Sequence, residues 1–361
     1  MAIKTIGSKK SNKFFKAMLA RSREQKNPLN VTFEITRRCN FYCPYCYRVG
    51  GFCPRQELNI KEITAILRQM ADAGVLCVAF TGGEPFARED IFDILECANR
   101  CGFKFNLMTN GYFIDENAAD RLKDVNINKV DISFNFLSPA AFDKFSGVKG
   151  SFVKVKNAIE ILSKKNIPVA LKATGMTLNK NELVALSRYA RNLRVPFYLD
   201  AEVSVCHSGC GDFSRKHSLD NAEVSFLMKA VYPEMFRPEA AVMRIKSRAR
   251  SGRMFSCAAG RDMFSVNPYG EMNFCVQIDY PRYNILAEGG IKSCWERIKN
   301  EINRLNTTKD YICVNCDIIK YCTHCCPGRA FAETGSFNSC SEYLRNMALE
   351  RKREKEIPRD Q

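Results

Sequence analysis

Three cysteines in the segment RRCNFYCPYCYR (37–48) are spaced for metal binding. Cys39, Cys43 and Cys46 fall within eight positions, so three thiolates could reach one centre. A structural zinc site is normally closed by four protein ligands, whereas a four-iron cluster held by three thiolates keeps one iron open for a small molecule. The chain has 18 cysteines but only three histidines, which argues against an imidazole-rich zinc or non-haem iron centre. The spacing therefore favours a cysteine-ligated iron–sulfur cluster.

A glycine-rich motif, TGGEP (81–85), supports this interpretation. It ends the second predicted strand, and its two glycines let the backbone approach a ligand without an intervening side chain. Taken alone, Gly-Gly before Glu-Pro is also a simple turn into the next helix. Taken together, the Cys-x3-Cys-x2-Cys spacing and TGGEP on consecutive strands resemble the radical S-adenosylmethionine (SAM) superfamily.

The resemblance implies a set of cofactor-binding residues. In that family the amine and carboxylate of SAM chelate the open iron, the aromatic residue before the third cysteine lies near the adenine, and the glycine-rich motif receives the methionine amino group. The family's fourth strand often carries Ser-Leu-Asp-Gly, and DISFNF (131–136) keeps its ribose-contacting serine but departs from it afterwards. Alternation along any barrel strand would also place residues 133 and 135 on one face. The implied cofactor-binding residues are Tyr45, Gly82, Gly83, Glu84, Ser133 and Asn135.

The resemblance also implies a reaction. An external electron reduces the cluster and breaks a carbon–sulfur bond of SAM, giving methionine and a 5′-deoxyadenosyl radical that takes a hydrogen atom from the substrate. A flavodoxin or ferredoxin is the implied electron donor. Asp200 and Glu202, at the end of the sixth predicted strand, are candidate catalytic proton acceptors, although alternating polar positions on a barrel strand are just as often structural.

A second group of cysteines begins at Cys257. Its spacing, Cys-x12-Gly-x4-Cys and then Cys-x2-Cys-x5-Cys-x3-Cys with Cys340 beyond, resembles the SPASM extension, a domain that carries auxiliary iron–sulfur clusters. The segment GRDMFSVNPYGEMNFC (260–275) is expected to form a β-hairpin with Gly270 at its turn. By resemblance, one auxiliary four-iron cluster is held by four cysteines: Cys313, Cys316, Cys322 and Cys340. The other auxiliary cluster is held by three: Cys257, Cys275 and Cys326.

The second of these auxiliary clusters is one ligand short. Either one of its irons is open, or Cys206 or Cys210 supplies the fourth thiolate. Cys325 is adjacent to Cys326 and could replace it through a shift of one residue. A zinc ribbon built on Cys-x2-Cys is the alternative, but the spacings that follow this pair fit zinc poorly.

SPASM-bearing radical enzymes act mostly on peptides or proteins, so the resemblance implies a peptide or protein substrate. The first interpretation is a ribosomal-peptide maturase that cross-links, epimerises or decarboxylates its substrate. A formylglycine-forming sulfatase maturase is the alternative, but those enzymes place an aspartate after the second hairpin cysteine, where this chain has Val276 and Gln277. The usual leader-recognition domain does not fit in the 30 residues before the first predicted strand, so leader binding is expected either to need a separate protein or not to occur.

The elements that must position these residues alternate regularly. From Val31 to about residue 205, apolar strand-like runs alternate with helical patterns in six steps. The expected fold class is α/β, a partial (β/α)6 TIM-like barrel with a small C-terminal SPASM domain, and an open doubly wound sheet is the alternative. The expected divisions are a basic N-terminal segment (1–28), the barrel (29–205), a helical connector (206–250), the SPASM domain (251–345) and a charged, frayed tail (346–361).

Composition agrees with a globular protein. A chain of 361 residues with 46% hydrophobic content suffices for one large core and a smaller unit, and no run is apolar enough for a membrane span. No secretory signal pattern is found, so reduced thiols and a cytoplasmic location are expected. The formal charge of +16 overstates the real charge if thiolates bind iron, so a nucleic-acid partner is not expected. The rival classes are a zinc-ribbon nucleic-acid binder and a non-catalytic iron–sulfur carrier, and TGGEP speaks against both.

Overall fold

The computed structural model describes residues 27–47, 55–205, 212–233, 254–255, 257–305, 311–322 and 326–356. Residues 1–26 of the basic N-terminal segment, the candidate ligands Cys206 and Cys210, and the alternative ligand Cys325 lie outside the described residues. Within the described ranges, no helix is long and apolar enough to cross a bilayer.

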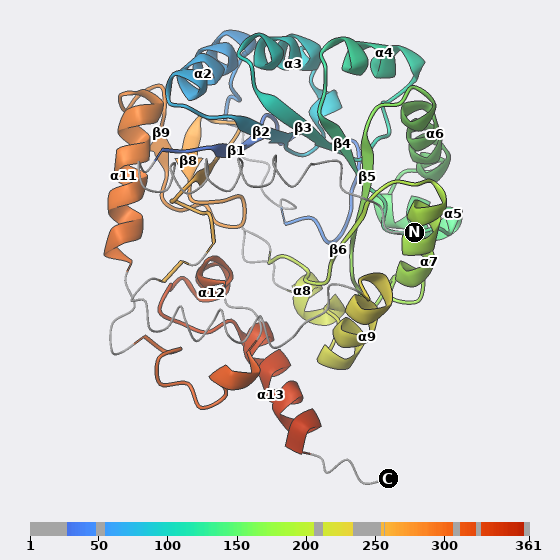
Figure 1. Cartoon of the computed structure of the whole chain (residues 1–361), viewed down its shortest axis with the longest axis vertical. Coiled ribbons are helices and arrows are strands. Elements are labelled where there is room, and N and C mark those ends of the chain that lie inside the picture. Colours follow the sequence, from blue (N-terminus) through green and yellow to red (C-terminus); the bar gives the residue numbers. More distant parts are fainter. Residues whose placement is uncertain are drawn as a thin grey trace, which may run out of the picture.

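Six parallel strands form the curved sheet that positions the site (Figure 1). Their order in the sheet, β6-β5-β4-β3-β2-β1, follows the chain in reverse, so each helical crossover joins neighbouring strands. This arrangement confirms the predicted α/β fold with six parallel barrel strands. The strands are β1 (Asn30–Glu34), β2 (Cys77–Thr81), β3 (Lys104–Thr109), β4 (Lys129–Ser133), β5 (Val169–Thr174) and β6 (Phe197–Asp200).

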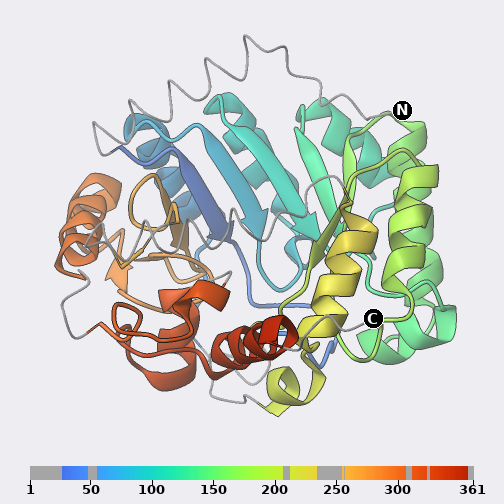
Figure 2. The same cartoon turned by 60° about the horizontal axis from the view of Figure 1, so that its bottom comes forward.

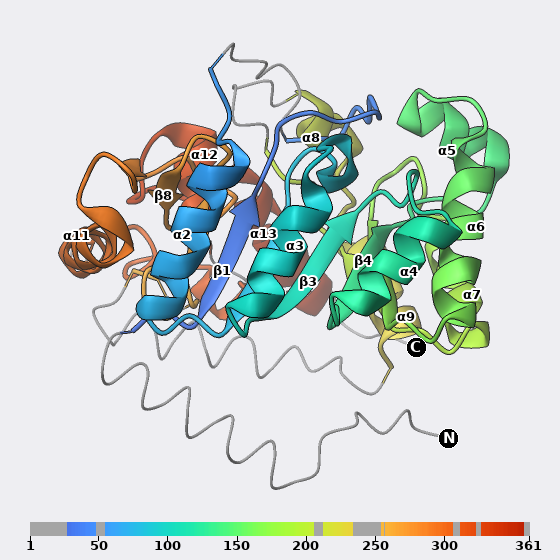
Figure 3. The same cartoon turned by 90° about the horizontal axis from the view of Figure 1, so that it is seen from above.

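Helices cover the outer face of this sheet, as Figures 1 and 3 show. The first of them, α2, starts with the predicted capping box: the Asn59 side chain accepts the Glu62 N–H, and the Glu62 carboxylate accepts the Asn59 N–H. The covering helices are α2 (Ile60–Asp72), α3 (Ile91–Arg100), α4 (Glu116–Asp124), α6 (Ser151–Lys164) and α7 (Leu183–Asn192). Two shorter helices were not predicted, η1 (Pro85–Ala87) and α5 (Pro139–Ser146), and each has proline in its first turn after an N-cap residue.

The two faces of the sheet differ in polarity. Phe33, Phe80 and Ile132 point outward to the helices and are fully buried, and the Phe33 and Phe80 rings lie 6.3 Å apart. The inner face carries polar side chains, among them Asp131 and Lys172. Apolar and polar side chains alternate in this way along strands that have an apolar core on one face only. The inner face is therefore where polar chemistry is possible.

The same sheet continues into the C-terminal half of the chain. β7 pairs in parallel with β1, with Val266 opposite Phe33, and β8 then pairs antiparallel to β7. Gly270 has a φ of +78° between these two strands, so the hairpin turns at the predicted glycine. The additional strands are β7 (Met263–Val266), β8 (Glu271–Asn273) and β9 (Tyr283–Asn284). The hairpin expected in the SPASM domain is thus part of the barrel sheet.

Of the remaining helices, α11 lies in the outer layer beside α2, and α12 and α13 lie on the open side of the sheet (Figures 1 and 2). α11 packs against α2, where the Ile291 N–H donates to the Gln69 side chain at 3.0 Å. These helices are α8 (Asp212–His217), α9 (Asn221–Val231), α11 (Gly290–Arg304), η2 (Ile319–Tyr321), α12 (Pro327–Thr334) and α13 (Glu342–Glu356).

The structure differs from the expectation of a frayed tail after residue 345. α13 continues to Glu356, and its Met347 and Ala348 are 5% and 1% exposed. The Glu350 carboxylate accepts the Asn221 N–H at 2.7 Å, which ties α13 to the start of α9. A helix rich in charge still forms here because its apolar positions face the protein.

Candidate functional site

The three N-terminal cysteines lie in the loop that leaves the carboxyl end of β1. The Cys39 thiol has two hydrogen-bond donors: its Sγ accepts the Phe41 N–H at 3.4 Å and lies 3.9 Å from Asn110 Nδ2. The Cys46 N–H donates to the Cys43 carbonyl at 3.2 Å, which makes a tight turn between those two cysteines. The loop thus presents the three thiols predicted as ligands from one short segment.

The chemistry of these thiols fits a metal cluster. Burial raises the pKa of Cys43 to about 12, and desolvation by nearby protein atoms raises that of Cys39 to about 11 although the residue as a whole is exposed. Neighbouring thiols add to the rise at both positions. Three thiolates are unfavourable in such a place unless a cation compensates them, and bound metal ions do so. The described residues contain no group of three or more His, Cys, Asp or Glu tight enough for a single metal ion. A cubane is larger than one ion, so its ligands stand further apart.

A carboxylate that sequence inspection missed fixes the start of the loop. Glu57 accepts the Thr36 hydroxyl at 2.9 Å and the Arg37 N–H at 2.5 Å. The buried Arg88 donates to the backbone carbonyls of Ile35 and Leu58, at 3.0 Å each, and so holds the same strand end from the other side. Neither residue had a local signal in the sequence, because their partners are distant along the chain.

The TGGEP motif packs directly on the backbone of the cysteine loop. The Gly83 N–H donates to the Thr36 carbonyl at 2.8 Å, and the Glu84 N–H donates to the Arg38 carbonyl at 2.7 Å. A Cβ on Gly83 would lie 2.3 Å from the Arg38 oxygen, so no side chain fits there. An ammonium group has donors only, so the partners that this motif offers it are the backbone carbonyl oxygens and the Glu84 carboxylate.

Glu84 connects the ends of β2 and β3. Its fully buried carboxylate accepts the Thr109 hydroxyl and the Asn110 N–H, both at 2.7 Å, and the Phe86 N–H at 3.1 Å. Burial raises the pKa of Glu84 to about 7, although these three donors oppose the rise. Glu84 therefore has a clear positioning role in addition to the predicted role in binding the cofactor.

Two of the residues predicted for the nucleoside lie together. Asn135 Nδ2 donates to the Tyr45 hydroxyl at 3.4 Å, and the Asn135 side-chain oxygen accepts the Thr174 N–H of β5 at 2.9 Å. The Tyr45 ring lies 5.2 Å from the Phe145 ring of α5, and burial raises the pKa of Tyr45, so its hydroxyl stays neutral. Ser133 ends β4 opposite Lys172 of β5, two residues before Asn135.

The structure brings one predicted auxiliary ligand set together. Burial raises the pKa of Cys275 to about 12 and also raises that of Cys326, and the nearby Cys257 adds to the rise at both positions. Cys326 is the N-cap of α12, where its Sγ accepts the Arg329 N–H at 3.3 Å. The four ligands predicted for the other cluster are partly buried, with three of them in the segment 311–322: Cys313, Cys316, Cys322 and Cys340.

The two predicted proton acceptors have different surroundings. Glu202 forms an ion pair with Arg329 at 3.1 Å, and the Arg329 side chain is only 9% exposed. Asp200 is exposed at the end of β6, where its carboxylate accepts the Glu202 N–H at 3.1 Å. The pairing gives Glu202 a role in joining β6 to α12, which is an alternative to proton transfer.

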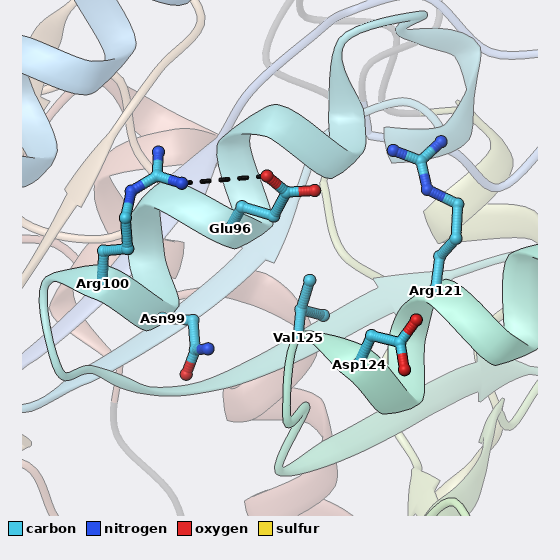
Figure 4. A pocket seen from close by; sticks show the side chains of 6 residues that line it. All are labelled: Glu96, Asn99, Arg100, Arg121, Asp124 and Val125. Carbon is cyan, nitrogen blue, oxygen red and sulfur yellow. Dashed lines mark ion pairs between the residues drawn. The ribbon is translucent and has the colours of Figure 1, made fainter.

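A pocket between α3 and α4 lies apart from this region (Figure 4). Glu96 and Arg100 form an ion pair at 3.7 Å along α3, on one side of the pocket, and the Arg121 guanidinium lies 3.8 Å from the centroid of the Phe92 ring. The pocket is lined by Glu96, Asn99, Arg100, Arg121, Asp124 and Val125. α3 and α4 start near the carboxyl ends of the strands and run toward the amino ends. The pocket residues stand late in both helices, so the pocket lies near the amino ends of the strands, and the cysteine loop lies at the carboxyl ends.

A family model of the Radical SAM superfamily matches residues 33–190. This range runs from β1 into α7 and includes the cysteine loop, the TGGEP motif and the Tyr45–Asn135 pair. The chain contains a radical SAM domain. Such a domain implies a four-iron cluster and SAM as cofactors, and the three thiols and the glycine motif fit that pair.

Known proteins match this radical SAM chain over different lengths. A PqqA peptide cyclase of Gluconobacter oxydans is 32% identical over 145 residues, which are 40% of this chain and 40% of that protein. The chain therefore spans less than half the length of this relative. An AdoMet-dependent heme synthase of Methanosarcina barkeri is 24% identical over 333 residues, which are 86% of this chain and 94% of that protein.

A solved structure resembles most of the chain. Streptococcus suis SuiB bound to its precursor peptide SuiA matches with a TM-score of 0.66 and 17% identity, over 93% of this chain and 80% of that chain. At this identity the likeness shows the fold. It extends beyond the radical SAM domain into the C-terminal half that carries the second group of cysteines.

Proposed function

We propose that this protein is a radical SAM enzyme that removes a hydrogen atom from a peptide substrate. The observation that carries the proposal is the contact between the three-cysteine loop and TGGEP, through the Gly83–Thr36 and Glu84–Arg38 backbone hydrogen bonds. These bonds hold the thiols beside backbone carbonyls and a buried carboxylate. One loop supplies ligands for iron, and the other supplies acceptors for an ammonium group.

The residues of the chain have distinct roles in this proposal. Cys39, Cys43 and Cys46 hold the cluster, which when bound supplies the electron for reductive cleavage of SAM and so for hydrogen-atom abstraction from the substrate. Gly82, Gly83 and Glu84 receive the methionine ammonium group. Tyr45, with Ser133 and Asn135, borders the nucleoside. The surrounding sheet and helices orient the substrate and exclude water.

A peptide is the substrate class best supported. The relative with the highest identity cited above is named a PqqA peptide cyclase, and SuiB of similar fold was solved with a precursor peptide. A second candidate is a carboxylate-bearing tetrapyrrole, because the AdoMet-dependent heme synthase aligns with 86% of this chain. Cross-linking, epimerisation and decarboxylation are the proposed reactions on a peptide, with a separate leader-binding protein as a proposed partner.

Two auxiliary four-iron clusters complete the proposal. The closeness of Cys257 to Cys275 and Cys326, which contributes to the raised pKa of both, supports the set that is short of one ligand. A flavodoxin or ferredoxin is the proposed electron donor, and the basic charge of the chain suits an acidic protein of that kind. Reduced thiols suit a cytoplasmic location.

The test is anaerobic reconstitution with iron and sulfide, followed by reduction with dithionite in the presence of SAM. The wild type is expected to release 5′-deoxyadenosine, and the Cys43→Ala variant is expected to release none. Cys97→Ala is the matched control, because Cys97 is buried in α3 and has no proposed role. Fully iron-loaded wild type that never forms 5′-deoxyadenosine would refute the function.

The substrate class is tested by co-expression with the small peptide encoded nearest the gene. Loss of two hydrogens from the peptide mass would indicate cross-linking, and loss of carbon dioxide would indicate decarboxylation. An unchanged mass with an inverted stereocentre would indicate epimerisation. A porphyrin carboxylic acid decarboxylated in place of any peptide would favour the second candidate.

A further inference from the structure

A buried carboxylate on the inner face of the sheet forms ion pairs with two lysines. Asp131 of β4 is 2% exposed, and each of its carboxylate oxygens faces a different ammonium group. Lys129 Nζ lies 2.8 Å from Oδ1, and Lys172 Nζ, from β5, lies 3.1 Å from Oδ2. One lysine would be enough to compensate one buried carboxylate, so this trio has one positive charge in excess.

Both lysine side chains remain partly accessible to solvent, although β4 and β5 have neighbouring strands on both sides. The Lys172 side chain keeps 36% of its surface exposed and the Lys129 side chain keeps 23%. Lys129 Nζ also lies 4.9 Å from the centroid of the Tyr198 ring on β6, and Tyr198 is itself 45% exposed. The described residues therefore leave part of the inner face of β4 to β6 uncovered, and a ligand there would meet ammonium groups and an aromatic ring.

The trio lies beside the proposed nucleoside position. Ser133, Lys172 and Tyr198 are direct neighbours across three adjacent strands, because Ser133 pairs with Lys172 and Lys172 pairs with Tyr198. Asn135, which contacts Tyr45, lies one step further toward the carboxyl edge and accepts the Thr174 N–H. A substrate that approaches the nucleoside from inside the barrel would therefore pass Lys172.

We propose that Lys172, supported by Lys129, binds a carboxylate of the substrate on the inner face of β4 and β5. This inference rests on the proposed function, since it concerns the substrate of the same site. A site with net positive charge favours an anion, and an ammonium–carboxylate pair on this partly enclosed face is stronger than at an open surface. The carboxylate belongs either to an acidic peptide side chain or to a propionate of a tetrapyrrole, and these two sources share the same chemistry.

The ammonium group proposed to bind substrate, that of Lys172, can be removed while Lys129 still compensates the Asp131 carboxylate. Lys129 is the nearer partner of Asp131, so replacing Lys172 with glutamine leaves the carboxylate with one ammonium group and a hydrogen-bond donor. Lys165 offers a matched control, because it is also a lysine between two carboxylates, Glu116 and Asp120, but stands at the end of α6 on the outer side. Lys172→Arg keeps the charge and tests for a general loss of folding.

The experiment measures binding by calorimetry with anaerobic, cluster-loaded protein and SAM, without reductant. The probes are two matched pairs: the peptides Ac-Ala-Glu-Ala-NH2 and Ac-Ala-Gln-Ala-NH2, and a porphyrin with free propionates and its methyl ester. In the wild type, the charged member of one pair is expected to bind about tenfold more tightly than the neutral member. Lys172→Gln is expected to abolish this preference, and Lys165→Gln and Lys172→Arg are expected to retain it.

The outcomes separate this inference from the proposed function. If the charged peptide binds more tightly than the neutral peptide, the carboxylate is that of an acidic side chain. If the porphyrin with free propionates binds more tightly than its methyl ester, the carboxylate is a tetrapyrrole propionate. No preference in either pair, or a preference that survives in Lys172→Gln, overturns the inference even if the wild type forms 5′-deoxyadenosine. Weaker SAM binding in Lys172→Gln with an unchanged preference also overturns it. Absence of 5′-deoxyadenosine refutes the function, whatever the binding data show.

Discussion

The Glu84 carboxylate accepts the Asn110 N–H at 2.7 Å, which joins the end of β2 to the end of β3. The side chain of the same Asn110 donates to Asn40 at 2.8 Å and lies 3.9 Å from Cys39 Sγ. One buried carboxylate therefore positions a residue of a third loop against the first predicted iron ligand. Three separate loops are thus connected at this edge of the sheet.

Glu84→Gln is expected to destabilise the protein by about 1–3 kcal/mol. The carboxylate accepts three donors, and the amide of glutamine would place its own N–H groups against one or more of them. Urea unfolding under anaerobic conditions measures the change. Glu89→Gln is the control, because Glu89 is exposed a few residues later. Equal stability of the two variants would show that the hydrogen-bond network is dispensable.

Stability is expected to depend on pH through Glu84. Its pKa is raised from 4.5 to about 7 by burial, so between these values the folded chain keeps a proton that the unfolded chain has lost. The free energy of unfolding of the wild type therefore falls as the pH rises through this window, and levels off above it. Because Glu84→Gln lacks this contribution, the stability difference between the two proteins should narrow with rising pH. Urea titrations from about pH 5 to about pH 8 measure it, and a constant difference would contradict the assignment.

Gly83→Ala is expected to prevent iron binding by the cysteine loop. The added Cβ would lie 2.3 Å from the Arg38 oxygen and 2.6 Å from the Arg37 oxygen, both of them backbone atoms that cannot rotate away. Iron and sulfide analysis after reconstitution measures the loss. Gly74→Ala is the control, since its φ of +86° costs about 1–2 kcal/mol in strain but no atom lies within 4 Å of the new methyl group. Iron content equal to that of this control would show that the loop tolerates the displacement.

Arg329→Ala is expected to destabilise the protein by about 3–5 kcal/mol. The buried guanidinium pairs with Glu202 at 3.1 Å and with Glu333 at 2.8 Å, so its removal leaves two carboxylates without this partner. Urea unfolding measures the change against Arg345→Ala, which removes an exposed arginine of α13. A variant as stable as this control would show that the link between β6 and α12 contributes little.

Cys275→Ala is expected to lower the iron content by one auxiliary cluster, about four irons. The variant should still cleave SAM, because Cys39, Cys43 and Cys46 are unaffected. Cys294→Ala is the control, since Cys294 is buried in α11 and has no predicted ligand role. Iron analysis and 5′-deoxyadenosine formation are measured on the same sample. An unchanged iron content would remove Cys275 from the ligand set.

Much of the fold was predictable because its signals are local. The apolar runs of β1 to β6 and the Asn59–Glu62 capping box are visible in short windows of sequence. The unpredicted α5 also carried a local signal, Ser138 before Pro139, which is typical of a helix start. The pairing of β7 with β1 had none, since nothing in a short strand identifies a parallel partner so distant along the chain.

The predicted ligands of the candidate site could be read from the sequence, but the residues that position its loops could not. Cysteine spacing and TGGEP are contiguous motifs, so they could be read directly from the sequence. Glu57 and Asn110 act through backbone atoms of other loops, and only the folded chain brings those partners together. Glu202 was predicted as a proton acceptor, but its pairing with Arg329 depends on α12, which follows more than a hundred residues later.

The parallel pairing of β7 with β1 has a consequence for biosynthesis. β1 carries the cysteine loop at its end, yet one of its two neighbours in the sheet is made only when residues 263–266 leave the ribosome. Until then the first strand has an unpaired edge, and the segment that leads into the loop is held from one side. Iron loading at the N-terminal cysteines is therefore expected to be a late event in the life of the chain, although its ligands are among the first residues to be translated.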